Sequence, residues 1–231
     1  MQASCCALIY CSQACHDLVM STYPTTLCGQ DFDRLQKPAL RVSHNAFPLR
    51  PLLMLRFPAT CVQAGADRHP LDHPLIARLQ PLAERSHLDV FTFTESIKTP
   101  IKVLQQLGIG VFANHNFDTM VPHTIWTRLA NNKAGSPDPT RGFIDEISPH
   151  LLLVNHICEP NVEWKRCGGS TTISFFATRD ITKGEELFSS YLNVKGMSRE
   201  ERIGALWPWF EEACLCSRCT REISAVLDVS R

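Results

Sequence analysis

Three cysteines near the C-terminal end constrain the fold more than any other feature of the sequence. Cys214, Cys216 and Cys219 lie within six residues, a density that favours a metal site over a disulfide framework. Zinc at a structural site takes four tetrahedral ligands, so a fourth must come from elsewhere in the chain. Cys158 is the first candidate, because it would clamp the tail over its own segment, and Cys167 is the alternative. The competing interpretation is three ordinary cysteines.

The composition indicates the cellular compartment of the protein and argues against two classes of partner, nucleic acids and membranes. The chain has eleven cysteines, and an odd count with tight local spacing fits metal thiolates in a reducing environment, which predicts the nucleus or cytoplasm. The net charge is zero and gives no electrostatic reason to expect direct binding to nucleic acid. No apolar stretch reaches the roughly 18 residues that a membrane span requires, and residues 1–10 lack the basic start of a signal peptide. We therefore expect no membrane partner.

The spacing of apolar residues predicts helices first and strands later. Helical spacing occurs at residues 75–79, 101–109 and 123–131. The region from Gly29 to about Leu107 is expected to be broken into short pieces by its prolines: Pro48, Pro51, Pro58, Pro70, Pro74, Pro81 and Pro100. Residues 132–142 are rich in Gly, Pro, Asp and Ser and predict an exposed loop.

Residues rich in β-formers come after this loop. We expect strands at residues 162–164, 171–178 and 187–191. Ser198 and Glu201 have the spacing of a capping box, so a helix is predicted over 198–209, ended or kinked by Pro208. The pattern as a whole indicates a mixed α+β fold.

Several motifs follow one another in the second half of the chain. Residues 155–161 read Asn-His-Ile-Cys-Glu-Pro-Asn, residues 177–181 Ala-Thr-Arg-Asp-Ile, and residues 184–191 Gly-Glu-Glu-Leu-Phe-Ser-Ser-Tyr, and the tail cysteines come next. In this order and at these distances they resemble the C-terminal half of a SET domain, the fold of protein lysine methyltransferases. The resemblance implies SET-type small β-sheets, a helical insert and a zinc-binding, cysteine-rich post-SET tail.

The resemblance also assigns roles to particular residues. It implies that Asn155 and His156 contact the methyl donor S-adenosylmethionine, that Tyr191 lies at the methyl-transfer site, and that Phe210 packs on the adenine. Methyl transfer from a sulfonium needs alignment and a polarised environment rather than a protein nucleophile. A phenol with a pKa of about 10 can orient the amine without titrating at neutral pH. The alternatives are a buried histidine and a core tyrosine with no catalytic part.

Two acidic residues within these motifs invite a general-base role that we do not assign. We expect Glu185 and Glu186 to finish a turn and pair with basic groups such as Arg179. Three histidines have no partner that the sequence suggests and are expected to be surface or core residues: His115, His123 and His150.

The N-terminal cysteines resemble the second half of a MYND zinc finger. The matching pieces are Tyr-Cys-Ser-Gln-Ala-Cys at residues 10–15 and Tyr-Pro-Thr-Thr-Leu-Cys at residues 23–28. Pro24 replaces a histidine ligand and Ala3 replaces a cysteine, so a full finger with two zinc ions is not expected. One distorted zinc site and a zinc-free helical remnant are both open. We divide the chain into a partial, degenerate MYND-like finger, a helical insert, a C-terminal SET core and a post-SET zinc tail, at residues 1–28, 29–143, 144–193 and 194–222.

Two departures from the family separate the hypotheses about function. The family's Gly-x-Gly segment for donor binding would precede the finger, and Gly108-Ile109-Gly110 follows a helical stretch and is no substitute. Glu212 occupies the place of a second aromatic on the adenine, which Trp209 is placed to replace. The resemblance implies a protein-lysine N-methyltransferase that uses S-adenosylmethionine and acts on a histone or non-histone protein. The alternatives are a non-catalytic SET–MYND interaction module and a truncated, inactive fragment lacking the N-terminal donor-binding strand.

Overall fold

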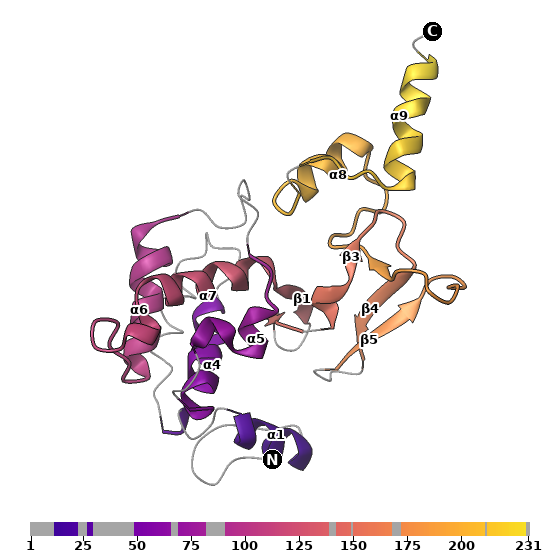
Figure 1. Ribbon diagram of the computed structural model, residues 1–231. Helices are drawn as coiled ribbons and strands as arrows, with labels where there is room; N and C mark the ends of the chain where they lie inside the picture. The colour runs from indigo at the N-terminus through magenta and orange to yellow at the C-terminus, as the bar shows by residue number, and fades with distance from the viewer. Residues whose placement is uncertain are drawn as a thin grey trace. The chain divides into compact units, whose positions relative to one another are not determined.

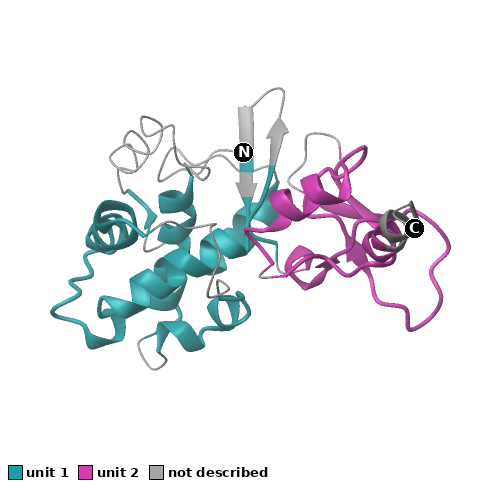
Figure 2. Cartoon of the chain, turned by 90° about the horizontal axis from the view of Figure 1, so that it is seen from above, with its two compact units in different colours: residues 1–82, 89–149 teal, residues 83–88, 150–231 magenta. Residues whose placement is uncertain are grey.

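The chain folds into two compact units, and each is described separately. The computed structural model describes residues 12–22, 27–29, 49–65, 69–81, 91–138, 142–148, 150–167, 172–210 and 212–229. The first unit consists of residues 1–82 and 89–149, and the second of residues 83–88 and 150–231 (Figures 1 and 2). Among the described residues, no helix combines the length and the apolar character needed to cross a membrane.

The first unit is built mainly from helices. Their bounds are α1 Gln13–Thr22, α4 Arg50–Gln63, η1 Pro70–Asp72, α5 Pro74–Ala77, the π-helical turn η2 Phe93–Lys98, α6 Thr99–Gln106, η3 His115–Phe117 and α7 Met120–Asn131. The helices α4, α6 and α7 pack on one another and bury Met54, Leu104, Ile125 and Trp126. The three helices predicted at 75–79, 101–109 and 123–131 are present as α5, α6 and α7.

The prediction that prolines break the first half into short pieces is wrong for α4. Pro58 lies inside this helix of 14 residues, although an internal proline costs about 3 kcal/mol. Nine residues of α4 are buried, and burial of that extent outweighs one lost backbone hydrogen bond. Other prolines start helices rather than end them, because a first-turn residue has no amide hydrogen bond to lose: Pro51, Pro70, Pro74 and Pro100.

Gly108 ends α6 in the manner expected of a helix stop. Its φ of 71° is in the left-handed region, which glycine adopts without a steric cost. The Gly108 amide donates to the carbonyl of Gln105 and the Ile109 amide to that of Leu104, each at 3.0 Å, which is the Schellman pattern. The Gly-Ile-Gly sequence therefore closes a helix, in line with its place after a helical stretch.

The prediction of an exposed loop at 132–142 is wrong in part. Strand β1, Ala134–Asp138, pairs antiparallel with β2, Gly142–Glu146, in a two-stranded sheet with Pro137 opposite Phe143. Residues of low β-propensity are held in this strand by pairing with a partner, and cross-strand contacts outweigh local preference. Proline is tolerated because both strands of a two-stranded sheet are edges.

The second unit combines two small sheets with two helices. Its elements are η4 Leu151–Leu153, β3 Asn155–His156, β4 Val162–Arg166, β5 Ile173–Ala177, β6 Phe188–Ser189, α8 Arg199–Leu206 and α9 Ser217–Val229. β4 and β5 form an antiparallel pair, and β3 and β6 a parallel pair in which His156 lies opposite Ser189. All three strands predicted here are confirmed. The capping box of Ser198 and Glu201 is also confirmed, and α8 ends before Pro208.

Candidate functional site

The core of the second unit is formed around cysteines. Cys158 and Cys219 are buried together with Val194 and Leu206, and Cys214 and Cys216 pack against them at partial exposure. The Sγ atoms of the four cysteines all lie within 4.8 Å of one another. Cys167 is exposed, and its Sγ lies 3.4 Å from the hydroxyl of Ser174. The structure thus favours Cys158 over Cys167 as the fourth member of the cluster.

The four sulfur atoms fit a zinc ion in spacing and chemistry. Zn–S bonds of about 2.3 Å in a tetrahedron separate neighbouring sulfurs by roughly 3.8 Å. The Cys158 Sγ lies 3.7 Å from that of Cys219 and 4.0 Å from that of Cys214. Burial, together with a hydrogen bond to Cys219, raises the pKa of the Cys158 thiol. Burial opposes ionisation of Cys216, but hydrogen bonds from the backbone amides of Cys219 and Cys158 and from the thiols of Cys214 and Cys219 together outweigh it and lower the pKa of Cys216 to about 7.

His156 connects this cysteine cluster to Tyr191. Its Nδ1 accepts a hydrogen bond from the backbone amide of Tyr191 at 3.0 Å, so the proton of the neutral ring is on Nε2. Nε2 lies 3.5 Å from the Cys158 Sγ and is the donor in that contact. One imidazole at the end of β3 therefore holds Tyr191, two residues after β6, and a cluster sulfur in a fixed relation, as second-shell histidine contacts do.

The protonation state of His156 is the first testable consequence. Burial lowers the pKa of this ring to about 4, below its ordinary value of about 6.5. Unfolded chains then bind more protons between these values, so the stability from the neutral ring is present above pH 6.5 and lost as the pH falls towards 4. We expect ¹⁵N NMR of the imidazole to show the neutral Nε2–H tautomer at pH 7 and at pH 5.5. A ring that is protonated at pH 5.5, or that carries its proton on Nδ1, would contradict this geometry.

Aromatic rings surround the side chain of Tyr191. The Phe210 ring is nearly parallel to it, with an interplanar angle of 8° and 6.0 Å between centroids. The Trp209 ring meets it edge-on at 6.4 Å, and the His156 ring lies 5.4 Å away. Tyr191 remains 39% exposed, yet partial burial raises the pKa of its phenol. The hydroxyl is therefore neutral at physiological pH, a dipole without a charge.

Asn155 and the two glutamates form a hydrogen-bonded group beside β3 and β6. The Glu185 carboxylate pairs with Arg179, as predicted, and accepts a 2.9 Å hydrogen bond from the Asn161 amide. Hydrogen bonds from Arg179, Asn161 and the Thr182 amide lower the pKa of Glu185 to about 2. The expected pairing of Glu186 with a basic group is wrong, because its Oε1 accepts from Nδ2 of Asn155 at 2.9 Å.

This contact orients Asn155. With Nδ2 committed to Glu186, the Oδ1 of this exposed residue accepts no hydrogen bond from any residue that the structure describes. An amide oxygen of this kind suits a ligand ammonium group. Sequence reasoning missed the contact of Glu186 with Asn155, because the two residues are 31 positions apart and only the pairing of β3 with β6 brings them together.

Asn161 is a structural residue that the motif contains but that sequence reasoning left without a role. It is 2% exposed, and its Nδ2 donates to Glu185 and to the carbonyl of Glu186 at 2.8 Å. Its Oδ1 accepts from the Phe188 amide at 2.7 Å. The side chain thus fixes the start of β6 against β4.

Replacing Asn161 should destabilise the second unit. We expect Asn161→Ala to lower the free energy of unfolding by about 2–3 kcal/mol, because a buried backbone amide loses its acceptor. Asn161→Asp should cost more, because a carboxylate would face Glu185 and the Glu186 carbonyl. Chemical denaturation measures both, with Asn193→Ala as the control, since exposed Asn193 accepts only a 3.4 Å hydrogen bond from Lys195. Equal stabilities for Asn161→Ala and Asn193→Ala would contradict the proposed bracing.

The histidines have mostly local contacts. His123, for which the sequence suggested no partner, has its Nδ1 3.0 Å from the carbonyl of Ser96 and packs against Phe91. His69 and His73 cap η1 and α5, accepting from the amides of Leu71 and Leu75. Histidine is an uncommon N-cap, so the sequence offered little signal for these roles.

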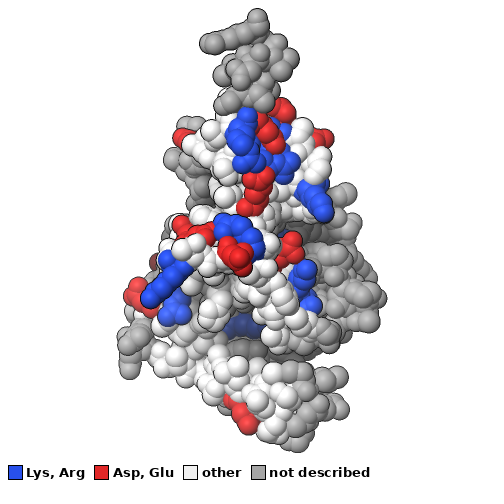
Figure 3. Space-filling model, turned by 90° about the vertical axis from the view of Figure 1, so that its right-hand side faces the viewer, with Lys and Arg blue, Asp and Glu red and all other residues white. Residues whose placement is uncertain are grey.

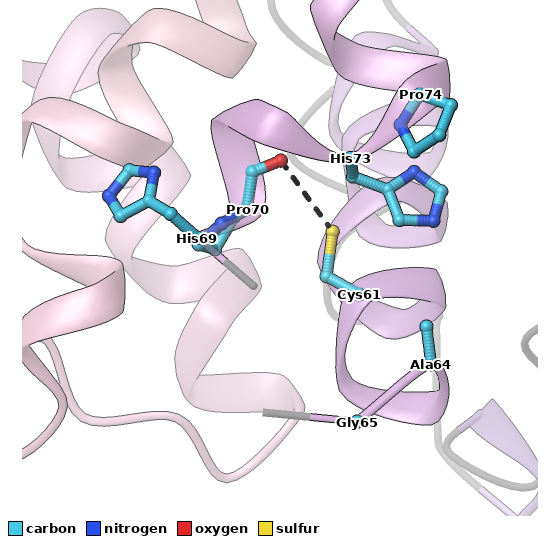
Figure 4. A pocket seen from close by; sticks show the side chains of 7 residues that line it. All are labelled: Cys61, Ala64, Gly65, His69, Pro70, His73 and Pro74. Carbon is cyan, nitrogen blue, oxygen red and sulfur yellow. Dashed lines mark hydrogen bonds between the residues drawn. The ribbon is translucent and has the colours of Figure 1, made fainter. Parts of the chain in front are cut away.

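A second candidate site is a pocket of about 450 Å³ in the first unit, lined by Cys61, Ala64, Gly65, His69, Pro70, His73 and Pro74. Figure 4 shows the Cys61 thiol directed at the Pro70 carbonyl, 3.9 Å away, and the His69 ring turned away from the thiol. Burial raises the pKa of Cys61 to about 11, so the thiol is not a nucleophile at neutral pH. The pocket therefore offers fewer reactive or directional groups than the cysteine cluster and its aromatic neighbours.

Charges of both signs are mixed on the face drawn in Figure 3. Arg221 pairs with Glu159 at 2.9 Å and Lys165 with Glu163 at 3.2 Å, and all four side chains are exposed. Pairs of this type contribute little stability. The N-terminal pattern stays a prediction, because Cys6, Cys11, Tyr23 and Pro24 lie outside the described residues, although Cys15 is on α1.

Comparison with known proteins gives one family. The profile of the SET domain matches residues 106–192. Histone-lysine N-methyltransferase SET5 of Yarrowia lipolytica is 44% identical over 69 residues, which are 30% of this chain and 16% of that protein. Histone-lysine N-methyltransferase set5 of Schizosaccharomyces pombe is 29% identical over 150 residues, 64% of this chain and 44% of that protein. N-lysine methyltransferase SMYD2-B of Danio rerio is 30% identical over 84 residues, 36% of this chain and 19% of that protein.

The chain spans less than half of the length of each of these relatives. The matched residues nevertheless include the Asn-His segment, Asn161, both glutamates and Tyr191, which the structure gathers into one group. Residues 106–192 of this chain are therefore similar to the SET domain, and parts of the chain are similar to proteins named as lysine methyltransferases.

Proposed function

We propose that this protein transfers a methyl group from S-adenosylmethionine to the side-chain amine of a lysine in a protein. The observation that carries the proposal is the convergence of Asn155, His156, Tyr191 and Phe210 from three separate segments. Names of relatives that act on histone lysines and on protein lysines support this substrate class. A histone substrate would require the protein in the nucleus, and a non-histone substrate is compatible with the cytoplasm.

The residues present fit the donor. Asn155 offers Oδ1 to the ammonium group of the donor's amino acid part, and Glu186 holds the amide in that orientation. Phe210 is half-buried and offers an aromatic face beside His156, with ring centroids 5.7 Å apart. Glu212 is exposed and provides no ring, whereas Trp209 already lies beside Tyr191 and is the available replacement. Ligand sites commonly combine apolar walls with a few directional polar groups in this way.

Tyr191 has the central part in the proposed chemistry. The donor supplies a methyl group on a sulfonium, and the lysine nitrogen forms the new C–N bond as the C–S bond breaks with its electron pair on sulfur. The amine must arrive deprotonated, and alignment provides most of the rate. The neutral phenol of Tyr191 directs the amine lone pair, and the aromatic rings around it limit access of water.

We further propose that Cys158, Cys214, Cys216 and Cys219 hold one structural zinc ion. Four thiolates leave no open position on the metal, so its part is to hold the tail in place. The tail carries Phe210 and Trp209, which precede Cys214 by only a few residues. Zinc would thereby keep both rings against Tyr191.

Binding and transfer are tested separately. Calorimetric titration of S-adenosylmethionine into the purified, zinc-loaded chain should show micromolar binding, weakened about tenfold or more by Asn155→Ala, because a charge-assisted hydrogen bond is lost. Incubation with methyl-labelled donor and core histones or a protein extract should label lysine. Donor binding without transfer to any protein would favour a non-catalytic interaction module. The absence of binding would reject the proposal for this chain.

A further inference from the structure

Arg202 is a buried cation beside the cysteine cluster. It lies on α8 and is 1% exposed, and the capping box fixes the helix start one turn before it. Its Nε is buried without a hydrogen-bond partner among the described residues. A guanidinium is always charged, and burying it costs several kcal/mol unless anions surround it. A contribution to folding stability is therefore a weak explanation for a buried arginine at position 202.

The contacts of Arg202 show which anions are near. Nη1 donates to the carbonyl of Met197 at 2.8 Å, and Nη2 donates to the Glu222 carboxylate at 2.6 Å. Nη2 also donates to the Sγ of Cys219 at 3.3 Å, a normal distance for a hydrogen bond to sulfur. Cys219 is itself fully buried. The guanidinium thus joins a glutamate on α9 to a cluster sulfur.

Glu222 does not balance the local charge by itself. The same carboxylate accepts a 3.0 Å hydrogen bond from Nε of Arg218, so two guanidinium groups share one anion. Four thiolates around one divalent ion carry a net charge of −2. The excess positive charge of the two guanidinium groups complements the excess negative charge of the metal-bound thiolates, and the hydrogen bond from Arg202 to the Cys219 sulfur joins the two.

We propose that Arg202 is the positioning residue of the cysteine cluster, balancing the charge of its metal-bound thiolates through a hydrogen bond to Cys219. This inference rests on the proposed zinc site and adds to it the group that makes a buried tetrathiolate stable. Arg202, which lies on α8, also links the cluster to the segment before this helix, because its guanidinium bonds both the Met197 carbonyl and the Cys219 sulfur.

Arg218 offers a matched comparison. It shares Glu222 with Arg202, and its Nη2 donates to the same Met197 carbonyl at 3.1 Å. Among the described residues, its guanidinium contacts no sulfur. If both arginines serve only to hold Glu222 and Met197, their replacement should have the same effect on zinc affinity. If Arg202 also acts on the metal-bound sulfur, its replacement should have the larger effect.

Zinc affinity by competition with a chromophoric chelator is the decisive measurement. Arg202→Met should weaken zinc binding about 10- to 100-fold, as expected for the loss of an outer-shell partner. Arg218→Met should weaken it less than about fivefold, the range for a partly exposed ion pair. Arg202→Lys keeps the positive charge but lacks the several N–H donors of a guanidinium, so its zinc affinity should lie between those of wild type and Arg202→Met. Circular dichroism at saturating zinc confirms that each variant is folded; if Arg202→Met is not, Arg202→Lys decides the comparison.

A spectroscopic signature separates contact with sulfur from general packing. In the cobalt-substituted protein, loss of a hydrogen bond to a thiolate raises the sulfur orbital energy and shifts the sulfur-to-metal charge-transfer band to longer wavelength. We expect this shift in Arg202→Met and its absence in Arg218→Met. Equal zinc affinities and equal spectra for the two variants would overturn the role of Arg202 and leave the zinc site intact. A wild-type chain that holds no zinc would overturn the metal proposal itself.

Discussion

Cys158→Ser is expected to abolish tight zinc binding and to unfold the second unit, whereas Cys167→Ser leaves both properties unchanged. The Cys158 Sγ lies 3.7 Å from that of Cys219 in the core of the unit, while Cys167 is exposed beside Ser174. Serine is not a zinc ligand at neutral pH, and the free energy of structural zinc binding, about 10–16 kcal/mol, is largely folding free energy. The loss should exceed the roughly 10- to 100-fold effect of an outer-shell change.

Native mass spectrometry for zinc and thermal unfolding by circular dichroism measure the two effects. Cys167→Ser is a matched control for Cys158→Ser, because each variant removes one thiol from the second unit. A difference between them therefore reports the position of the thiol. One zinc ion in wild type and Cys167→Ser, and none in Cys158→Ser, is the expected pattern. Retention of zinc by Cys158→Ser with loss in Cys167→Ser would reverse the assignment of the fourth ligand. A wild-type chain without zinc would remove the cluster as a metal site.

Tyr191→Phe should reduce the rate of methyl transfer about 10²- to 10³-fold and leave donor binding nearly unchanged. The magnitude is that of removing one preorganised donor at a reacting centre. The phenyl ring keeps the contacts of Tyr191 with His156 and Phe210, so the change is confined to the hydroxyl. Single-turnover transfer of labelled methyl measures the rate, and calorimetry measures the donor affinity.

Phe210→Leu should affect donor binding rather than the hydroxyl at the transfer step, which is the opposite of what is expected for Tyr191→Phe. Removal of its aromatic face should weaken donor binding by about 1–3 kcal/mol, by analogy with stacking of bases on aromatic residues. Trp207→Phe is the control, because Trp207 is exposed at the end of α8, and the rings that contact Tyr191 in the described part of the chain are those of His156, Trp209 and Phe210. Equal losses of transfer and donor binding in Tyr191→Phe would place the hydroxyl in the donor site rather than at the transfer step.

Local sequence signals were sufficient for some elements and not for others. Ser198 and Glu201 predicted their capping box, because both partners lie within one helical turn. The strand β1 was missed, because Gly135 and Pro137 carry no strand signal and only pairing with β2 holds them. Pro58 was misread as a helix breaker, because the burial of α4 depends on helices far along the chain.

The same distinction applies to the candidate site. Cys158, His156 and Tyr191 were named from motifs, and the structure adds the hydrogen bonds that join them. The partnership of Asn155 with Glu186 and the approach of Arg202 to Cys219 depend on tertiary contacts across 31 and 17 residues. A charged residue in the middle of an amphipathic helix is usually a solvated one, so nothing in the sequence marked Arg202 as buried.

The distance along the chain between Cys158 and its partners has a consequence for folding. Cys158 and Cys214 are 56 residues apart, and zinc shared between them would close this loop in the unfolded chain as well as in the folded one. By the chain-entropy relation for a covalent cross-link, closure of such a loop is worth about 4 kcal/mol. The hairpin of β4 and β5 lies inside the loop and needs no closure to form, whereas the parallel pair of β3 and β6 joins residues 33 positions apart. The supply of zinc would then set how fast the unit matures after synthesis, and metal-starved cells would accumulate chains in which this loop is not closed and the tail is not docked.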